Sequence, residues 1–253
     1  MGIGNKIRKV IAKYAPISLD QMDGVKLMRR MDTKYVFRLD QLPALLKQAK
    51  NNYFMVEIEE EREQIYKTTY YDTENYDMYH AHHNGNMNRH KIRVRKYVYT
   101  HQKFIEVKRK NNKGETIKNR IAHPDKVHVL NAENSETFLN KYSPFKTHAL
   151  VPKLDNKFVR LTLVNKDFSE RITLDYKLKF TDLKYQLKTE IKDVCICEIK
   201  KGRDNKNSPF IGYLRDLRIQ SMGFSKYSLG IALLNPDVKT NNFKRRIRAI
   251  IKI

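Results

Sequence analysis

The sequence predicts an α+β protein, mainly antiparallel β, whose strands form a closed β-barrel covered by helices. At least five segments alternate like β-strands, with Lys or Arg on one face and apolar side chains on the other. Each carries at most one carboxylate, whereas an ordinary exposed sheet face mixes both signs of charge. A closed barrel would give the cations a shared interior, and helices predicted at residues 40–50 and 209–221 would cover the apolar outer faces.

Length and composition indicate a folded chain. It has 253 residues, of which 40% are hydrophobic and 10% aromatic, which is enough for a substantial core in one large or two small domains. Its two cysteines, Cys195 and Cys197, are spaced for neither a disulfide framework nor a zinc site, so we expect a reducing, cytoplasmic compartment. No apolar run approaches the roughly 20 residues of a membrane span.

The net charge of +23 is the strongest clue in the composition. It exceeds what solubility requires and destabilises the fold through self-repulsion. An anionic partner would account for it, and the open classes are polyphosphate, nucleotide, nucleic acid and an anionic membrane surface. Nucleic acid is the least favoured, because the sequence has no recognised nucleic-acid motif and no aromatic platforms flanking the strand arginines.

Both ends of the chain are basic and amphipathic. We divide the chain into an N-terminal segment (1–19), a central domain (20–235) and a C-terminal tail (236–253). In the first segment Ile7, Val10 and Ile11 share one face of a short helix, and residues 239–253 hold six Lys or Arg and no acid. Such segments can contact the inner face of a membrane or a membrane-protein partner, although so short a helix more often docks on its own domain.

The most basic stretch, residues 89–120, is predicted to form three strands. It contains twelve Lys or Arg and two carboxylates. The residues at 111–114, Asn-Asn-Lys-Gly, supply the turn before the third strand. The polar positions of these strands are Arg93, Arg95, Glu106, Lys108 and Lys118.

Other predicted strands repeat this pattern. In residues 171–178 the alternation places Arg171, Thr173, Asp175 and Lys177 opposite Ile172, Leu174, Tyr176 and Leu178. The remaining polar faces carry Arg30, Asp32 and Lys34, then Arg160, then Glu198 and Lys200. Arginines without partners would be very costly to bury, so the interior must hold water or a polyanion.

One helix has a clear start signal. Ser208 followed by Pro209 is typical of an N-cap and a first helical position. The following residues place Phe210, Tyr213 and Leu214 on a buried face. An extended stretch at 223–228 comes next and contains Lys226.

Seven short motifs together resemble the VTC-type polyphosphate polymerase domain of the triphosphate tunnel metalloenzymes. They are RMDTKYVF at 30–37, YYDT at 70–73, KIRVRKY at 91–97, IEVKRK at 105–110, RITLDYKLKF at 171–180, CEIK at 197–200 and FSKY at 224–227. Any one of them is weak alone. They follow the order of the family from about Asp20 to Leu234, which is nearly the whole chain.

The resemblance implies an eight-stranded antiparallel tunnel that binds a nucleoside triphosphate with a divalent metal, Mn²⁺ or Mg²⁺. Glu198 would be the metal ligand. The implied phosphate-binding residues are Lys34, Arg93, Arg95, Lys108, Lys118, Arg160, Arg171 and Lys226. Six of these would be catalytic: Lys34, Arg93, Arg95, Lys108, Arg171 and Lys226.

Two positions differ between branches of the family. The hydrolytic branch opens with Glu-x-Glu-x-Lys, whereas this chain has Arg30-x-Asp32-x-Lys34, as in the polymerase branch. The polymerase branch also often has a second lysine three residues before the one at Lys226, and here that position is Gly223. One missing cation bears on affinity or on control of chain length.

The resemblance implies an ATP-dependent polyphosphate polymerase that transfers the γ-phosphate of ATP to a growing chain and releases ADP. A terminal phosphate oxygen is already anionic at neutral pH, so the attack needs no general base. Hydrolysis would need an activated water, and the scarcity of inward acids favours transfer. Two alternatives stay open: a triphosphatase of the same fold, and an inactive module that binds polyphosphate or nucleotide.

Overall fold

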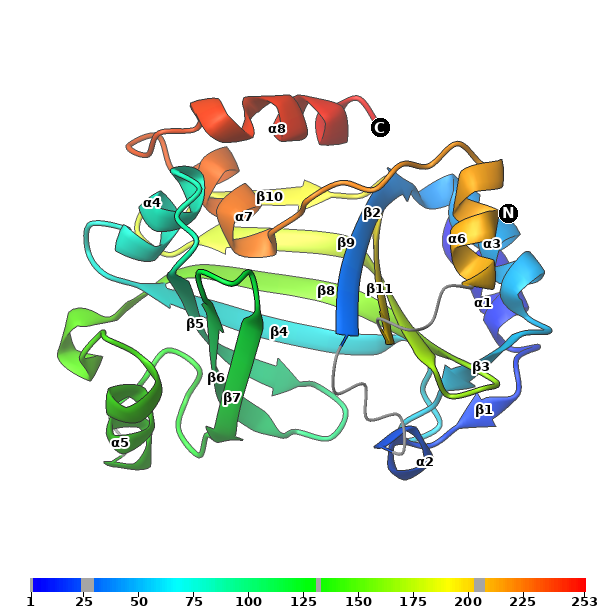
Figure 1. The fold of residues 1–253 in the computed structure, drawn as a ribbon, viewed down its shortest axis with the longest axis horizontal. Helices are drawn as coiled ribbons and strands as arrows, with labels where there is room; N and C mark the ends of the chain where they lie inside the picture. The colour runs from blue at the N-terminus through cyan, green and yellow to red at the C-terminus, as the bar shows by residue number, and fades with distance from the viewer. Residues whose placement is uncertain (1, 24–29, 131–132, 203–207) are drawn as a thin grey trace.

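A computed structural model describes residues 2–23, 30–130, 133–202 and 208–253 (Figure 1). Its centre is one strongly curled sheet of 11 strands, eight of which form a continuous antiparallel order. In that order the strands are β2 (Arg30–Arg38), β11 (Val194–Gly202), β9 (Glu170–Asp182), β8 (Val151–Asn165), β4 (Gln64–Asp72), β5 (Arg89–Tyr97), β6 (Lys103–Lys110) and β7 (Thr116–Ala122). Three short strands flank it: β1 (Pro16–Ile17), β3 (Tyr53–Val56) and β10 (Lys188–Ile191).

The prediction of a closed barrel is wrong, because the sheet forms a half-barrel. Strands β2 and β7 end the order, and over the residues that the structure describes they do not pair with each other. Residues 221 and 222 occupy part of the edge of β2. Tyr35 forms an isolated bridge with Ser221, and the amide of Met222 donates to the carbonyl of Lys34 at 2.8 Å. These contacts satisfy backbone groups that closure would have used.

Two separate layers cover the convex face of the half-barrel. Helices α1 (Ile3–Ile11), α3 (Leu42–Ala49) and α6 (Pro209–Asp216) pack over β2, β11, β9 and β8. The second layer, α5 (Glu133–Tyr142), lies over β5 and β6, where Phe138 and Leu139 meet Val94 and Ile105. The prediction that the helices near 40–50 and 209–221 cover apolar strand faces is therefore confirmed.

Helix α6 begins where the sequence predicts and ends earlier. The Ser208 hydroxyl accepts a hydrogen bond from the amide of Ile211 at 3.2 Å, and Pro209 occupies the first turn. The helix ends at Asp216, five residues before the predicted end at 221. Its buried residues, Phe210 and Leu214, join the convex-face core.

Helices α4 (Asp77–His83), α7 (Lys226–Leu234) and α8 (Lys244–Ile251) cover one end of the concave face. In Figure 1, α8 runs above α7 at the top of the molecule. Helix α7 packs very closely on the sheet at Gly230. A Cβ at that position would lie 2.5 Å from Leu154 of β8 and 2.7 Å from Phe180 of β9.

Each of the two end helices buries apolar residues against the protein, although Ile251 of α8 is 70% exposed. In α1, Ile7, Val10 and Ile11 are buried beside α3, and in α8 Ile250 is buried. None of the helices in the described part of the chain is long and apolar enough to cross a membrane. The fold gives no support to the predicted membrane contact. The short helix α2 (Leu19–Asp23) lies just before the gap at 24–29.

Candidate phosphate-binding site

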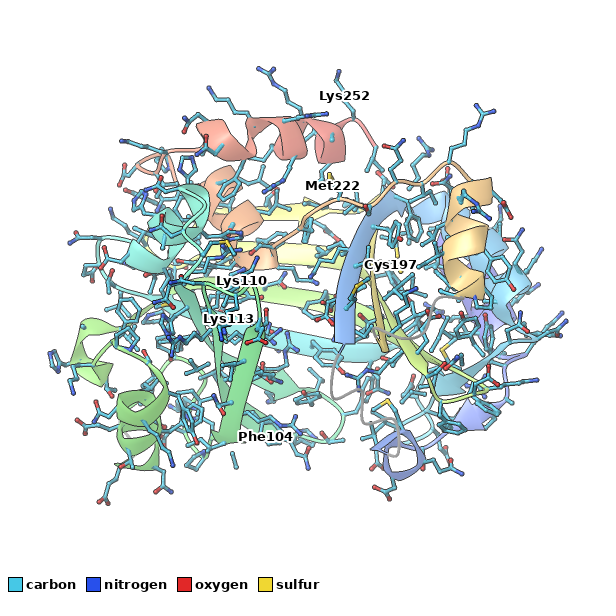
Figure 2. The ribbon with its side chains drawn as sticks, in the orientation of Figure 1. Phe104, Lys110, Lys113, Cys197, Met222 and Lys252 are labelled. Atoms are coloured by element: carbon cyan, nitrogen blue, oxygen red, sulfur yellow. The ribbon has the colours of Figure 1, made fainter. Side chains whose placement is uncertain are left out.

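A cavity of about 1330 Å³ lies between the two edge strands, at the place where a closed barrel would have its seam. Its walls are residues 31–34 of β2, residues 114–118 at the start of β7, residues 221–225, and parts of β5, β6, α7 and α8. Lys110 of β6 and Met222, both labelled in Figure 2, belong to different walls of this space. The lining side chains include seven Lys or Arg but only three carboxylates, Asp32, Glu115 and Glu198.

A buried carboxylate on β9 organises the cations behind the cavity. Asp175 accepts hydrogen bonds from the Arg160 guanidinium at 2.6 and 2.7 Å and from Lys226 Nζ at 2.5 Å. Burial alone would raise the pKa of Asp175, but Arg160 and Lys226 outweigh it and hold this pKa well below its usual range. The three groups therefore stay ionised as a compact ion-paired cluster.

An aromatic pair lies beneath this cluster. The rings of Tyr66 and Phe158 stack at 5.3 Å with an interplanar angle of 7°. The guanidinium carbons of Arg160 and Arg95 lie 5.0 and 5.3 Å from the Tyr66 ring centroid, and Lys226 Nζ lies 4.5 Å from that of Phe158. Cation–π attraction thus helps to hold three predicted phosphate-binding residues in place.

A second buried carboxylate plays the same part on β6. Glu106 is fully buried, accepts a hydrogen bond from Arg93 Nε at 2.7 Å and forms an ion pair with Lys118. Burial opposes ionisation of Glu106, but the charges of Arg93, Arg95 and Lys118 hold its pKa far below its usual range. We call Glu106, Asp175 and the cations that they hold, Arg93, Lys118, Arg160 and Lys226, the inner cluster.

The predicted metal ligand, Glu198, lies on β11, away from Glu106 of β6. Glu198 Oε1 is 3.1 Å from Lys34 Nζ, and its Oε2 is 3.0 Å from Lys200 Nζ. Although burial opposes ionisation, Lys200, Lys34 and Lys108 hold the pKa of Glu198 well below its usual range. This carboxylate is therefore anionic at neutral pH, and it lines the cavity.

The donor set around Glu198 fits one kind of metal site. The structure shows no group of three or more His, Cys, Asp or Glu placed to hold a metal within the residues that it describes. A closed site of the structural zinc type therefore does not fit. Mg²⁺ commonly binds through one or two carboxylates together with substrate phosphates, and a single Glu198 matches that pattern.

Cations also face one another directly across three neighbouring strands. Lys91, Lys108 and Lys118 are register partners on β5, β6 and β7, and all three line the cavity. Directly opposed like charges destabilise a sheet. Burial, followed by the charges of Arg89 and Lys34, lowers the pKa of Lys91 to about 7. Burial and Arg93 likewise lower the pKa of Lys108 well below its usual range.

The structure gathers the nine predicted site residues on the concave face, and Lys118 both lines the cavity and belongs to the inner cluster. Four of them line the cavity: Lys34, Lys108, Lys118 and Glu198. Arg93, Arg160 and Lys226 belong to the inner cluster, and Arg95, which is 6% exposed, lies over the aromatic pair. Arg171 of β9 is partly buried and is the register partner of Lys200.

Sequence reasoning missed five cations of the site as candidates. Arg89 and Arg246 line the cavity, and the other three, Lys91, Lys110 and Lys200, lie on strands next to predicted residues. Lys91 and Lys110 line the cavity, and Lys200 binds Glu198. Their positions in the alternating strands were a usable signal, since each shares a face with a predicted site residue two positions away. Position 223 also differs from the expectation of a missing cation, because the Arg246 guanidinium of α8 lies beside it.

The fold is of the tunnel type, in which a curled antiparallel sheet presents cations on its concave face. A family model for the VTC domain matches residues 29–235, and the chain belongs to this family. The resemblance found in the sequence is thereby confirmed. None of the curated proteins matches the chain.

Solved structures share this fold at low sequence identity. A Hippeastrum protein, described as a candidate adenylyl cyclase with a dominant triphosphatase activity, is 13% identical with a TM-score of 0.52. The match covers 83% of this chain and 98% of that one. A Bacillus halodurans protein, described as a candidate adenylate cyclase, is 10% identical with a TM-score of 0.51, covering 78% of this chain and 94% of that one.

Proposed function

We propose that the chain is an ATP-dependent polyphosphate polymerase. It transfers the γ-phosphate of ATP to the end of a growing inorganic polyphosphate chain within the cavity and releases ADP. The observation that carries this proposal is the cavity itself, with seven cations and three carboxylates, in a chain of the VTC family. Phosphoryl transfer depends mainly on charge neutralisation and in-line positioning, which such a cavity supplies.

The cations differ in what they can do for a phosphate chain. Arginine presents a planar fork that binds two phosphate oxygens and stays charged, so Arg93, Arg95, Arg160 and Arg171 would orient the nucleotide. Lysine acts as a point charge, and Lys34, Lys108, Lys118 and Lys226 would neutralise the transferred phosphoryl group and its neighbours. Four of these cations are held in place before substrate arrives: Glu106 pairs with Arg93 and Lys118, and Asp175 pairs with Arg160 and Lys226.

A divalent cation, Mn²⁺ or Mg²⁺, would be held by Glu198 and by phosphate oxygens of the substrate. When bound, it would supply further neutralisation of the charge on those oxygens. Lys34 and Lys200, which flank Glu198, would bind the same phosphates from either side.

The state of the buried carboxylates supports transfer over hydrolysis. A general base works best with a pKa near the working pH. Glu106, Asp175 and Glu198 each have a pKa held well below the usual range by neighbouring cations, so each is a weak base. The attacking phosphate oxygen of a polyphosphate end is already anionic and needs no such base.

The test is a product assay with purified protein, ATP and Mn²⁺ or Mg²⁺. Polyphosphate is separated on gels, and ADP and free phosphate are counted in parallel. The expected result is a ladder of long chains with matching ADP, lost in Glu198→Gln and Lys34→Ala. The matched control is Lys157→Ala, which removes an exposed lysine of the same sheet outside the cavity lining.

Two other outcomes would replace the proposal. Free phosphate without chains would make the chain a triphosphatase, the second candidate, which the fold shared with the Hippeastrum protein supports. Binding of ATP or polyphosphate without turnover would leave an anion-binding module. Normal chain synthesis by Glu198→Gln would show that the metal assignment is wrong.

A further inference from the structure

The cation rows on β5 and β6 continue beyond the residues that the proposed function uses. Arg89 and Lys110 are register partners at the outer end of the two strands, and both line the cavity. Neither forms an ion pair with a carboxylate in the described part of the chain; Arg89 donates to the carbonyl of Asn86 at 2.7 Å. Two opposed cations without a counter-ion are an arrangement that costs stability.

A third cation reaches the same end of the cavity from α8. The Arg246 guanidinium carbon lies 3.8 Å from the position that a Cβ on residue 223 would occupy, so the missing side chain of Gly223 leaves it room. Phe243 and Ile250, both buried, fix α8 on either side of it. Arg246 lines the cavity and has no carboxylate partner among the residues that the structure describes.

The three cations converge on one place, and His82 marks it. This side chain lines the cavity and bonds through Nδ1 to the Ser228 hydroxyl at 2.6 Å. Burial comes first among the causes that lower the pKa of His82 to about 2, followed by the charges of Lys91, Arg89, Arg246 and Lys110. Cations from three elements thus line the same cavity as one neutral imidazole and act on it electrostatically.

The distance along β5 between Arg89 and Arg93 indicates what kind of anion could contact both residues. Four residues separate Arg89 from Arg93 of the inner cluster, which corresponds to about 13 Å of strand rise. A linear chain of more than three phosphates spans this length more fully than a triphosphate does, and it can contact Arg93 and Arg89 together.

We propose that Arg89, Lys110 and Arg246 form an outer subsite that holds the phosphates of a linear polyphosphate beyond the three nearest the inner cluster. The subsite deepens the proposed function and rests on it for the orientation of the chain. It makes α8, which follows the residues matched by the family model, part of the binding surface.

The test compares two probes by calorimetry: inorganic tripolyphosphate and a long linear polyphosphate. Arg246→Ala should weaken binding of the long chain about tenfold, the size expected for one charge-assisted contact. It should weaken tripolyphosphate binding far less. The matched controls are Arg245→Ala and Arg248→Ala, which remove exposed arginines of the same helix that do not line the cavity. These variants should leave the ratio of the two affinities unchanged.

A rescue variant separates a lost contact from a loosened helix. Gly223→Lys combined with Arg246→Ala returns a cation to the same place from a different element, and should restore much of the long-chain affinity. Loosening of α8 would not be repaired in this way. The dependence of long-chain affinity on salt should also become less steep in Arg246→Ala and recover in the double variant, because one fewer counterion is released.

Several results would overturn the subsite: equal losses for both probes, the same loss in Arg245→Ala, no rescue, or no preference of the wild type for the long chain. Equal, Arg246-dependent binding of a single-stranded oligonucleotide would assign the surface to nucleic acid instead. These measurements need no turnover. A chain that fails to synthesise polyphosphate can therefore still pass them, and a working polymerase can fail them.

Discussion

The inner cluster and the outer subsite are both rich in cations, but they are neutralised differently. In the inner cluster, Asp175 holds two cations and Glu106 holds two more. At the outer end, Arg89 and Lys110 oppose each other across the strands with no carboxylate ion pair among the described residues. The inner cations are thus neutralised by carboxylates of the protein itself. The outer cations have no carboxylate ion pair among the described residues and can still bind an anion.

This difference predicts opposite effects of substitution at the two places. Removing a carboxylate from the inner cluster should lower the free energy of unfolding, because it leaves buried cations without a counter-ion. Removing a cation from the outer end should cost the free protein little and should cost ligand binding much. The following predictions test this contrast, from the largest expected effect to the smallest.

The largest effect is expected for Asp175→Asn. It leaves Arg160 and Lys226 buried without their counter-ion, and breaking a buried pair costs about 3–5 kcal/mol of the free energy of unfolding. Denaturant unfolding measures it. The control is Glu190→Gln, whose ion pair with Lys179 lies at the surface and should change stability by less than about 1 kcal/mol. Equal effects of the two variants would contradict the contrast.

Gly230→Ala should come next. The added methyl would lie within 2.7 Å of Leu154 and Phe180, so α7 would have to move off the sheet, and overpacking of this kind costs about 1–3 kcal/mol. Because α7 begins at Lys226, the variant should also weaken tripolyphosphate binding. The control Gly212→Ala, at a helix position where a Cβ meets nothing within 4 Å, should not destabilise the protein.

Phosphate affinity should fall as pH rises. Burial is the largest cause that lowers the pKa of Lys91 to about 7 and those of Lys118 and Lys226 to about 8. A phosphate ligand favours the charged lysines, so tripolyphosphate binding should take up protons near pH 8 and weaken from pH 7 to 9. Calorimetry in buffers of different ionisation enthalpy measures the proton uptake, and Lys91→Met should remove part of it.

The sign is opposite for the free protein. The folded-state pKa of each of these lysines lies below that of the unfolded chain, so the unfolded chain binds more protons between about pH 7 and 10. These groups therefore add to the free energy of unfolding as pH rises through that window. A wild-type protein whose phosphate affinity rose with pH would show that these lysines do not contact the ligand.

The smallest effect is expected for Lys110→Ala in the absence of ligand. It relieves repulsion from Arg89 and should raise the free energy of unfolding by a few tenths of a kcal/mol. The same variant should weaken binding of long polyphosphate. A clear loss of stability, measured by denaturant unfolding, would mean that Lys110 has a structural role.

Much of the strand architecture is local, and the sequence predicts it. The period-two alternation correctly places Lys34, Arg160 and Glu198 on the concave side, because each position depends only on its neighbours in the strand. The alternation fails at Lys177. Its φ of 54° marks a β-bulge, where the register between β8 and β9 shifts. Beyond the bulge, Leu178 and Phe180 join the core beneath α7.

Closure of the barrel could not be predicted in this way. It depends on whether two strands far apart in sequence meet, and here residues 221–222 lie along β2 instead. The site divides similarly. The resemblance names nine candidate site residues. It gives neither the pairing of Glu106 with Arg93 nor the approach of Arg246, which depends on how the C-terminal helix docks.

The seam between β2 and β7 also determines how firmly the edge of the cavity is held together. A closed barrel resists widening through its ring of backbone hydrogen bonds, which must break before the strands can separate. In the described residues no strand pairing joins β2 to β7. The edge of β2 is held instead by the bridge of Tyr35 with Ser221 and by the hydrogen bond from the Met222 amide to the carbonyl of Lys34. Few backbone hydrogen bonds therefore need to break before this edge of the cavity can widen, whereas a sealed barrel would have to lose several at once.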